Sequence, residues 1–133
     1  MRATMVLLGA ASLVAGCAAT DGRDTFSRDR EDLERRLAGR VAGAPQACVT
    51  GRQGQALRAV DRRTIVYDGG RELWVNRLEA DCPAMRPDSI LIVEPSGDRY
   101  CRLDRIRPLD RAGAIPGPIC PLGNWTPYRR AGS

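Results

Sequence analysis

From about residue 46 onward, apolar residues tend to alternate with polar ones, and turn-forming residues interrupt them at short intervals. Interruptions about every 8 to 12 residues are typical of a small all-β unit. The pattern predicts strands at 47–50, 55–60, 63–67, 72–78, 89–93 and 99–107. In the last of these the alternation shifts around Asp104, which predicts a β-bulge there.

Turn residues and prolines add detail to this prediction. Asp68-Gly69-Gly70 and the segment 95–98 are each predicted to form a hairpin turn. The run 90–93 is wholly apolar, so we expect a central strand that is covered on both faces. Segment 113–127 contains four prolines, which lack the N–H that a ladder needs. We expect it to wrap the domain as an ordered coil, not to form a central strand.

Residues 27–40 have a longer period and predict a helix. Leu33, Leu37 and Val41 fall on one face, acidic residues come early and arginines late, which complements the helix dipole. Gly43 and a nearby proline are expected to end it. Because the apolar stripe is narrow, we expect the helix to dock on the domain that follows; the alternative is a frayed linker.

Residues 1–16 have the layout of an export signal, with a basic residue, an apolar stretch and small residues before Cys17. The stretch is shorter than the roughly 20 residues that a membrane-spanning helix needs. The run 13–17 resembles the bacterial lipobox, which implies that Cys17 is acylated and becomes the first mature residue. The alternatives are a plain secretory signal with a chance cysteine, or a buried apolar helix.

The lipobox resemblance also implies a location in the cell, and the pattern along the chain indicates how the chain is divided into segments. Residues 18 and 19 are alanines and not aspartate, which favours the outer membrane, facing the periplasm. Residues 17–43 are expected to form a lipidated tether and a short helix, and residues 44–130 a small β domain. We expect the membrane to be a partner, which the protein contacts through the lipid on Cys17.

Four cysteines remain in the expected domain, namely Cys48, Cys82, Cys101 and Cys120. A domain this small buries little apolar surface, and exported domains of this size commonly add disulfides. An even number predicts two disulfides, with three pairings open. A chain reversal near 110–111 favours Cys101–Cys120 and Cys48–Cys82. The expected fold is mainly β, a small antiparallel sheet or partly closed barrel with one N-terminal helix and two disulfides.

Composition argues against catalysis and against a metal site. The chain of 133 residues has no histidine, the most frequent general base and metal ligand, and it has no Cys-x-x-Cys pair. Asp61, Asn76 and Asp104 are the best polar candidates for chemistry, but aspartates at turns commonly bond their own backbone. We expect no enzyme activity, no catalytic residue, no metal and no cofactor.

The net charge is +5, from 21 arginines and 16 acidic residues, with no lysine. Basic proteins can bind phosphates, but here the arginines are interspersed with aspartates and glutamates and no basic run exceeds two residues. The pattern favours a mixed-charge surface and no nucleic-acid partner. An anionic envelope polymer stays open as a partner.

Several short motifs together resemble an uncharacterised proteobacterial lipoprotein family, "domain of unknown function 6491". They are Cys48-Val49, the segment 61–65, the segment 74–78, Cys82-Pro83, the spaced Cys101, Asp104 and Ile106, and the spaced Cys120, Leu122, Gly123, Trp125 and Pro127. The resemblance implies an envelope protein and supplies no activity.

The sequence therefore favours an outer-membrane-anchored lipoprotein that acts as a structural or interaction module with an envelope protein. The second hypothesis is a module that binds a small ligand or an envelope polymer, with Trp74, Trp125 and Tyr128 lining a pocket. The third, an enzyme, would require Asp61 and Asp104 to lie together in a cleft.

Overall fold

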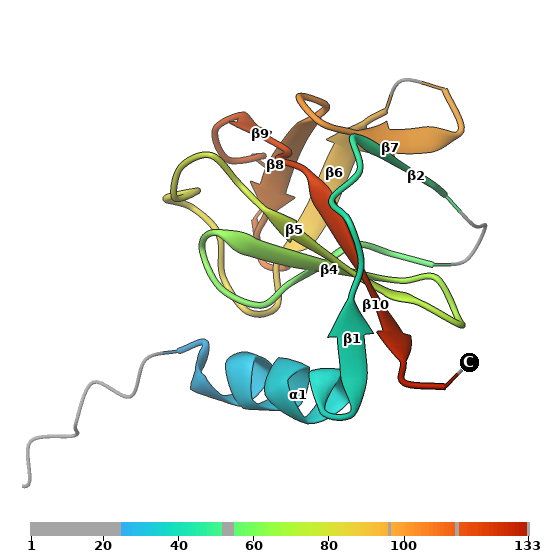
Figure 1. Ribbon diagram of the computed structural model, residues 1–133. Helices are drawn as coiled ribbons and strands as arrows, with labels where there is room; N and C mark the ends of the chain where they lie inside the picture. Colours follow the sequence, from blue (N-terminus) through green and yellow to red (C-terminus); the bar gives the residue numbers. More distant parts are fainter. Residues whose placement is uncertain (1–24, 52–54, 96, 114, 133) are drawn as a thin grey trace, which may run out of the picture.

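One helix and ten short strands make up the part of the chain that the computed structural model describes, residues 25–51, 55–95, 97–113 and 115–132 (Figure 1). The elements are α1 (Ser27–Leu37), β1 (Arg40–Ala42), β2 (Cys48–Thr50), β3 (Arg58–Ala59), β4 (Thr64–Asp68), β5 (Leu73–Arg77), β6 (Ile90–Glu94), β7 (Arg99–Cys101), β8 (Arg105–Leu109), β9 (Cys120–Pro121) and β10 (Trp125–Arg130). The prediction of a mainly β fold with one N-terminal helix is confirmed.

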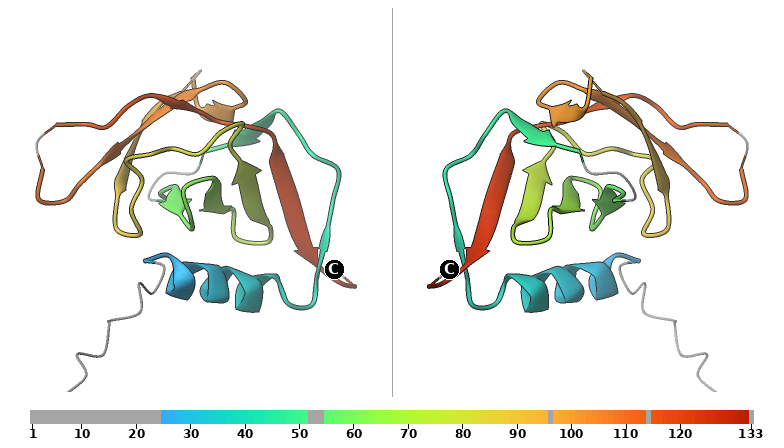
Figure 2. Two further views of the ribbon diagram at one scale, coloured as in Figure 1. Left: turned by 90° about the vertical axis from the view of Figure 1, so that its left-hand side faces the viewer. Right: turned by 90° about the vertical axis from the view of Figure 1, so that its right-hand side faces the viewer.

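The strands form three antiparallel sheets. The largest has the order β1-β10-β5-β4-β3, a second has β6-β8-β9, and β2 pairs with β7. In Figure 2, α1 lies along one side of the five-stranded sheet, and the other two sheets lie toward its opposite side. All of these described elements fall between Thr25 and Gly132.

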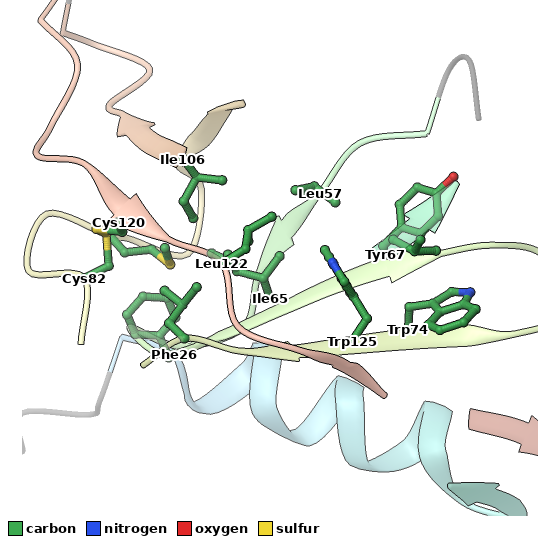
Figure 3. Packing of buried hydrophobic residues seen from close by; sticks show 14 residues of the cluster. Phe26, Leu57, Ile65, Tyr67, Trp74, Cys82, Ile106, Cys120, Leu122 and Trp125 are labelled. Atoms are coloured by element: carbon green, nitrogen blue, oxygen red, sulfur yellow. A yellow bond between two sulfur atoms is a disulfide. The ribbon is translucent and has the colours of Figure 1, made fainter. Parts of the chain in front are cut away.

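Strands β4 and β5 of the five-stranded sheet are buried on both faces because their side chains alternate between two apolar clusters. On β4, Val66 joins the cluster under the helix, whereas Ile65 and Tyr67 join the larger cluster on the other side. On β5, Trp74 belongs to the larger cluster. Figure 3 shows the larger cluster, in which the rings of Tyr67 and Trp74 lie beside Trp125.

The prediction that the helix docks on the domain is confirmed. Leu33 is 6% exposed and packs with valines and a leucine of the five-stranded sheet. Asp32 adds an ion pair from the helix to β3, with 2.8 Å between its Oδ2 and an Nη of Arg58. The Arg58 guanidinium, hydrogen-bonded to Asp32, lowers the pKa of that carboxyl below its ordinary value.

The helix is shorter than predicted. It ends at Leu37, before the expected stop, because Gly39 adopts a left-handed φ of +73° that reverses the chain into β1. Val41 is therefore not on the helix, and its side chain is 60% exposed on β1.

The apolar run of β6 was predicted to be central and covered on both faces, which is wrong. β6 is an edge strand of the described three-stranded sheet, and only alternate residues, Leu91 and Val93, pack against the core. Ile90 and Ile92 face outward and are 46% and 37% exposed. A continuous apolar run does not by itself show that a strand is covered on both faces.

One turn prediction and one strand prediction are corrected, and the β-bulge predicted around Asp104 is a turn between two strands. The segment around Pro95 joins β6 to β7, which belong to different sheets, so it closes no hairpin; Ser96 lies outside the described residues. The predicted strand 99–107 is two strands, because a tight turn with Leu103 at φ +72° separates β7 from β8. The hairpin turn at Asp68-Gly69-Gly70 joins β4 and β5 as predicted.

The C-terminal segment does contain a central strand, contrary to the prediction. β10 lies between β1 and β5, and Pro127 stands opposite Trp74. In an antiparallel ladder the N–H and C=O of one residue point to the same side. The carbonyl of Pro127 accepts a hydrogen bond from Gly43, so its missing donor faces the end of β1, away from β5. The hydrogen bonds between β10 and β5 are therefore unaffected by the proline.

The two predicted disulfides form, but the favoured pairing is wrong. Cys48 bonds to Cys101, directly opposite it across β2 and β7, and Cys82 bonds to Cys120. The β8–β9 register places Cys120 opposite Ile106, so the chain reverses about residue 113 and not about 110–111. Cys101 lies on the preceding strand, outside this hairpin. Figure 3 shows the second disulfide at the edge of the core.

Candidate functional site

Arginines from three distant parts of the chain meet where α1 ends, β1 begins and β10 ends. They line two open hollows of about 560 and 580 Å³ that share two of these arginines. We call this set the arginine pole; its members are Arg35, Arg36, Arg40, Arg71, Arg129 and Arg130. In Figure 1 it lies at the end of the molecule marked by the C-terminus.

Strand register and turn geometry bring the pole together. In the β1–β10 ladder, Arg40 stands opposite Arg130, and Arg129 stands opposite the next residue of β1. Arg71 lies in the turn between β4 and β5, beside Gly70, whose φ is +88°. The end of α1 supplies Arg35 and Arg36. Residues more than 90 positions apart in the sequence therefore share one surface.

Arg40 holds the framework of the pole. Its Nε donates to the carbonyl of Arg36 at 3.0 Å, and its Nη1 donates to the carbonyls of Arg71 and Tyr128 at 3.3 and 3.2 Å. It thereby joins the helix end, the β4–β5 turn and β10. A cation at a helix C-terminus is also favourable for the helix dipole. We assign Arg40 a positioning role, since its hydrogen bonds point into the protein.

Three carboxylates lie beside these arginines and order part of the pole. Asp68 pairs with Arg36 at 2.6 Å, Glu72 pairs with Arg129 at 2.5 Å, and Asp32 of α1 pairs with Arg35 at 3.3 Å. Six arginines against three carboxylates leave the pole and its paired residues with a net charge of +3. The whole chain has +5, so the other residues together contribute +2. More than half of the net charge of the chain is thus concentrated at the pole.

The chemistry that suits this surface is the binding of anions. A guanidinium presents a rigid set of donors that matches the oxygens of a phosphate or a carboxylate. The side chains of Arg35 and Arg129 are 69% and 56% exposed, so a partner in solvent can reach them. Because the hollows are open and lined by charged side chains, they suit an extended charged surface better than one enclosed small molecule.

The sequence pattern did not reveal the pole. Along the chain its members stand singly or in pairs, separated by acidic residues, and this pattern predicted an evenly mixed surface. The register of β1 on β10 and the docking of α1 decide which charges become neighbours. The facing arginines at the ends of β1 and β10 become recognisable only once the pairing of these strands is known.

The three polar candidates for catalysis are held by their own turns and neighbours. Asp61 accepts hydrogen bonds from the backbone N–H of Arg63 and the hydroxyl of Thr64, as an aspartate at a turn does. Asp104 accepts from the N–H of Cys101 at 2.7 Å, across the β7–β8 turn. These contacts give each carboxylate a structural role in a turn.

Asn76 is fully buried and makes a two-way lock with Gly123. Its Nδ2 donates to the Gly123 carbonyl at 2.8 Å, and its Oδ1 accepts from the Gly123 N–H at 2.9 Å. The lock attaches the segment that precedes β10 to β5. Both polar groups of the Asn76 amide are therefore used for the fold.

The structure does not gather the three aromatic residues that were expected to line a pocket. Trp125 and Trp74 belong to the core and are 0% and 8% exposed, and Trp125 packs edge-on against Tyr67 with ring centroids 6.4 Å apart. Tyr128 is half-buried beside the other cluster, under the helix. The burial of the two tryptophans commits their rings to packing.

The predicted lipidation site, Cys17, lies outside the described residues. Among the residues that are described, no helix is both long enough and apolar enough to cross a membrane. The same residues contain no group of three or more Cys, Asp or Glu side chains placed to hold a metal ion.

Comparison of this chain with family models, with curated proteins and with solved structures finds no match. The arginine pole is therefore interpreted from its own residues.

Proposed function

We propose that this protein is a lipid-anchored interaction module of the bacterial cell envelope that binds an anionic partner through the arginine pole. In this proposal the thiol of Cys17 carries the lipid, the anchor lies in the outer membrane, and the domain faces the periplasm. The module works by binding and not by catalysis.

The observation that carries the proposal is the segregation of charge. A net +3 on nine charged side chains, against +2 on the rest of the chain, creates a positive potential at one end of a small domain. Such a field attracts anions and orients the protein as they approach. A surface with interspersed charges would do neither.

Two further features support the envelope setting. The Cys48–Cys101 and Cys82–Cys120 disulfides suit an oxidising compartment, as the periplasm is. The segment 1–17 has the layout of a lipoprotein signal, and several acyl chains on one residue give stable anchoring. Both features agree with export followed by lipidation.

The proposal is tested with a soluble polyanion, long-chain inorganic polyphosphate, titrated into the chain 18–133 by calorimetry. The test variant is Arg35→Gln with Arg71→Gln, which removes two exposed pole charges and keeps Arg40 and its framework. The matched control is Arg99→Gln with Arg105→Gln, which changes the net charge equally on β7 and β8, away from the pole.

We expect binding that weakens with salt, and a larger loss of affinity in the pole variant than in the control. Equal losses in the two variants would show that only net charge matters. No binding at low salt by the unchanged domain would remove the proposal altogether.

A further inference from the structure

We infer that the anionic partner of the arginine pole is the phosphate-bearing headgroup surface of the bilayer that holds Cys17. In this arrangement the domain rests against its own membrane with the pole facing the lipid. The inference rests on the proposed function, because it requires both the anchor on Cys17 and a pole that binds anions.

The first argument is reach. Eight residues lead from Cys17 to Thr25, and a fully extended chain covers at most about 3.6 Å for each, or roughly 29 Å in total. From there α1, with 11 residues, extends about 16 Å to the pole. Figure 2 shows α1 running along the outside of the sheet toward the ends of β1 and β10. A domain tethered at Thr25 can therefore bring its pole to the membrane.

The second argument is the distribution of charge on the side of the molecule that the tether holds near the lipid. Outside the pole, the exposed residues of α1 are Arg28, Glu31 and Glu34, whose net charge is −1. The outward face of the helix therefore gives no net attraction to an anionic surface. Since the pole is the neighbouring region with a large net charge, it decides the orientation of the domain.

The third argument is energetic. An arginine close to an anionic membrane strengthens binding about fivefold, and the effect is lost beyond a Debye length. For a free protein a few such contacts give moderate binding that is measurable at low salt. For an anchored one the membrane is always present at a high effective concentration, so weak contacts suffice to hold an orientation.

The first experiment measures sedimentation of the chain 18–133 with lipid vesicles. This chain lacks the apolar leader and Cys17, and it contains the whole described fold, so any binding comes from the domain. The vesicles are phosphatidylcholine alone, or phosphatidylcholine with half of it replaced by phosphatidylglycerol. We expect salt-sensitive binding to the anionic vesicles only.

Charge variants then locate the contact. Arg35→Gln with Arg71→Gln should lower the partition onto anionic vesicles by roughly 25-fold, at about fivefold for each arginine. Arg99→Gln with Arg105→Gln, on the far sheets, should change it far less. Circular dichroism of each variant checks that the fold is retained.

The second experiment uses the lipidated protein in its native membrane and a water-soluble arginine reagent. We expect Arg71 to be modified more slowly than Arg99, and detergent to remove the difference. Equal modification of the two residues in the membrane would overturn the inference.

The outcomes separate the inference from the proposed function. If polyphosphate binds at the pole but anionic vesicles do not, the membrane is not the partner and the proposed function stands. Equal binding to neutral and anionic vesicles, or equal losses in the two variants, would also overturn the membrane inference alone. If neither polyphosphate nor vesicles bind, both fail.

Discussion

The lock between Asn76 and Gly123 allows a quantitative test of how this small domain is stabilised. The Asn76 side chain is 0% exposed, and it pairs with both backbone groups of Gly123. Replacing it with alanine leaves one buried donor and one buried acceptor unpaired, at about 1–3 kcal/mol each. We therefore expect Asn76→Ala to lower the free energy of unfolding by about 2–6 kcal/mol, a large part of the roughly 5–15 kcal/mol typical of a domain.

Asn76→Asp gives the sharper result because it depends on pH. The introduced carboxylate still accepts from the Gly123 N–H but faces the Gly123 carbonyl without a proton to donate. Burial and that carbonyl raise the pKa of the carboxyl above its value of about 3.9 in the unfolded chain. Its protonated form restores both hydrogen bonds.

The sign follows from linkage. A pKa raised in the folded state gives stability that is complete below the unfolded pKa and is lost as pH rises through the folded pKa. If the carboxyl stays protonated in the folded protein, the cost at pH 7 is about 1.36 kcal/mol per unit above 3.9, or roughly 4 kcal/mol. Near pH 4 this cost almost disappears.

Guanidinium unfolding, followed by the fluorescence of the two buried tryptophans, measures these differences at about pH 7 and about pH 4. Asn124→Ala is the control, because Asn124 is exposed in the same segment. We expect Asn76→Asp to recover relative to the unchanged protein at the lower pH, while Asn76→Ala does not. If Asn76→Asp were equally destabilised at both values, or Asn124→Ala matched Asn76→Ala, the lock would not have the assigned role.

Three other predictions concern the disulfides, the helix and a glycine. Non-reducing tryptic mapping should recover peptide 41–52 linked to 100–102, and 78–99 linked to 112–129, because each of the four domain cysteines lies in a separate peptide; any other linkage contradicts the pairing. Asp32→Asn should cost about 0.2–1 kcal/mol at neutral pH, measured by denaturant unfolding, because it breaks the ion pair with Arg58. Since the pKa of Asp32 is lowered in the fold, its stabilisation is present above the unfolded pKa and is lost as pH falls through the folded one, so a difference that persists in acid would refute this explanation. Gly123→Ala should destabilise strongly in thermal melts, because a Cβ there would collide with the backbone carbonyl of Arg77; Gly113→Ala, whose Cβ would find only ordinary contacts, should be tolerated, and similar melting temperatures for the two would contradict the geometry.

Local patterns in the sequence determined the class of the fold. The 3.6-residue period of Leu33 and Leu37 and the alternation around Ile65 and Trp74 each describe one segment and the face that it buries. The turn at Asp68-Gly69-Gly70 depends only on its own residues. Such features require no knowledge of distant partners, so a mainly β domain with a docked helix could be predicted. The even number of domain cysteines likewise predicted two disulfides.

The tertiary structure decided which segments are neighbours. The pairing of Cys48 with Cys101 depends on the β2–β7 register, and Pro127 is tolerated in a central strand because its nitrogen faces the end of β1. The arginine pole arises in the same way, when β10 places Arg130 opposite Arg40. Exposed charges contribute little to folding, so no local pattern records where they will gather. The sequence by itself determined the helix, the strands and the need for disulfides. Only strand register and helix docking decided which cysteines pair and which arginines form the surface that binds anions in our proposal.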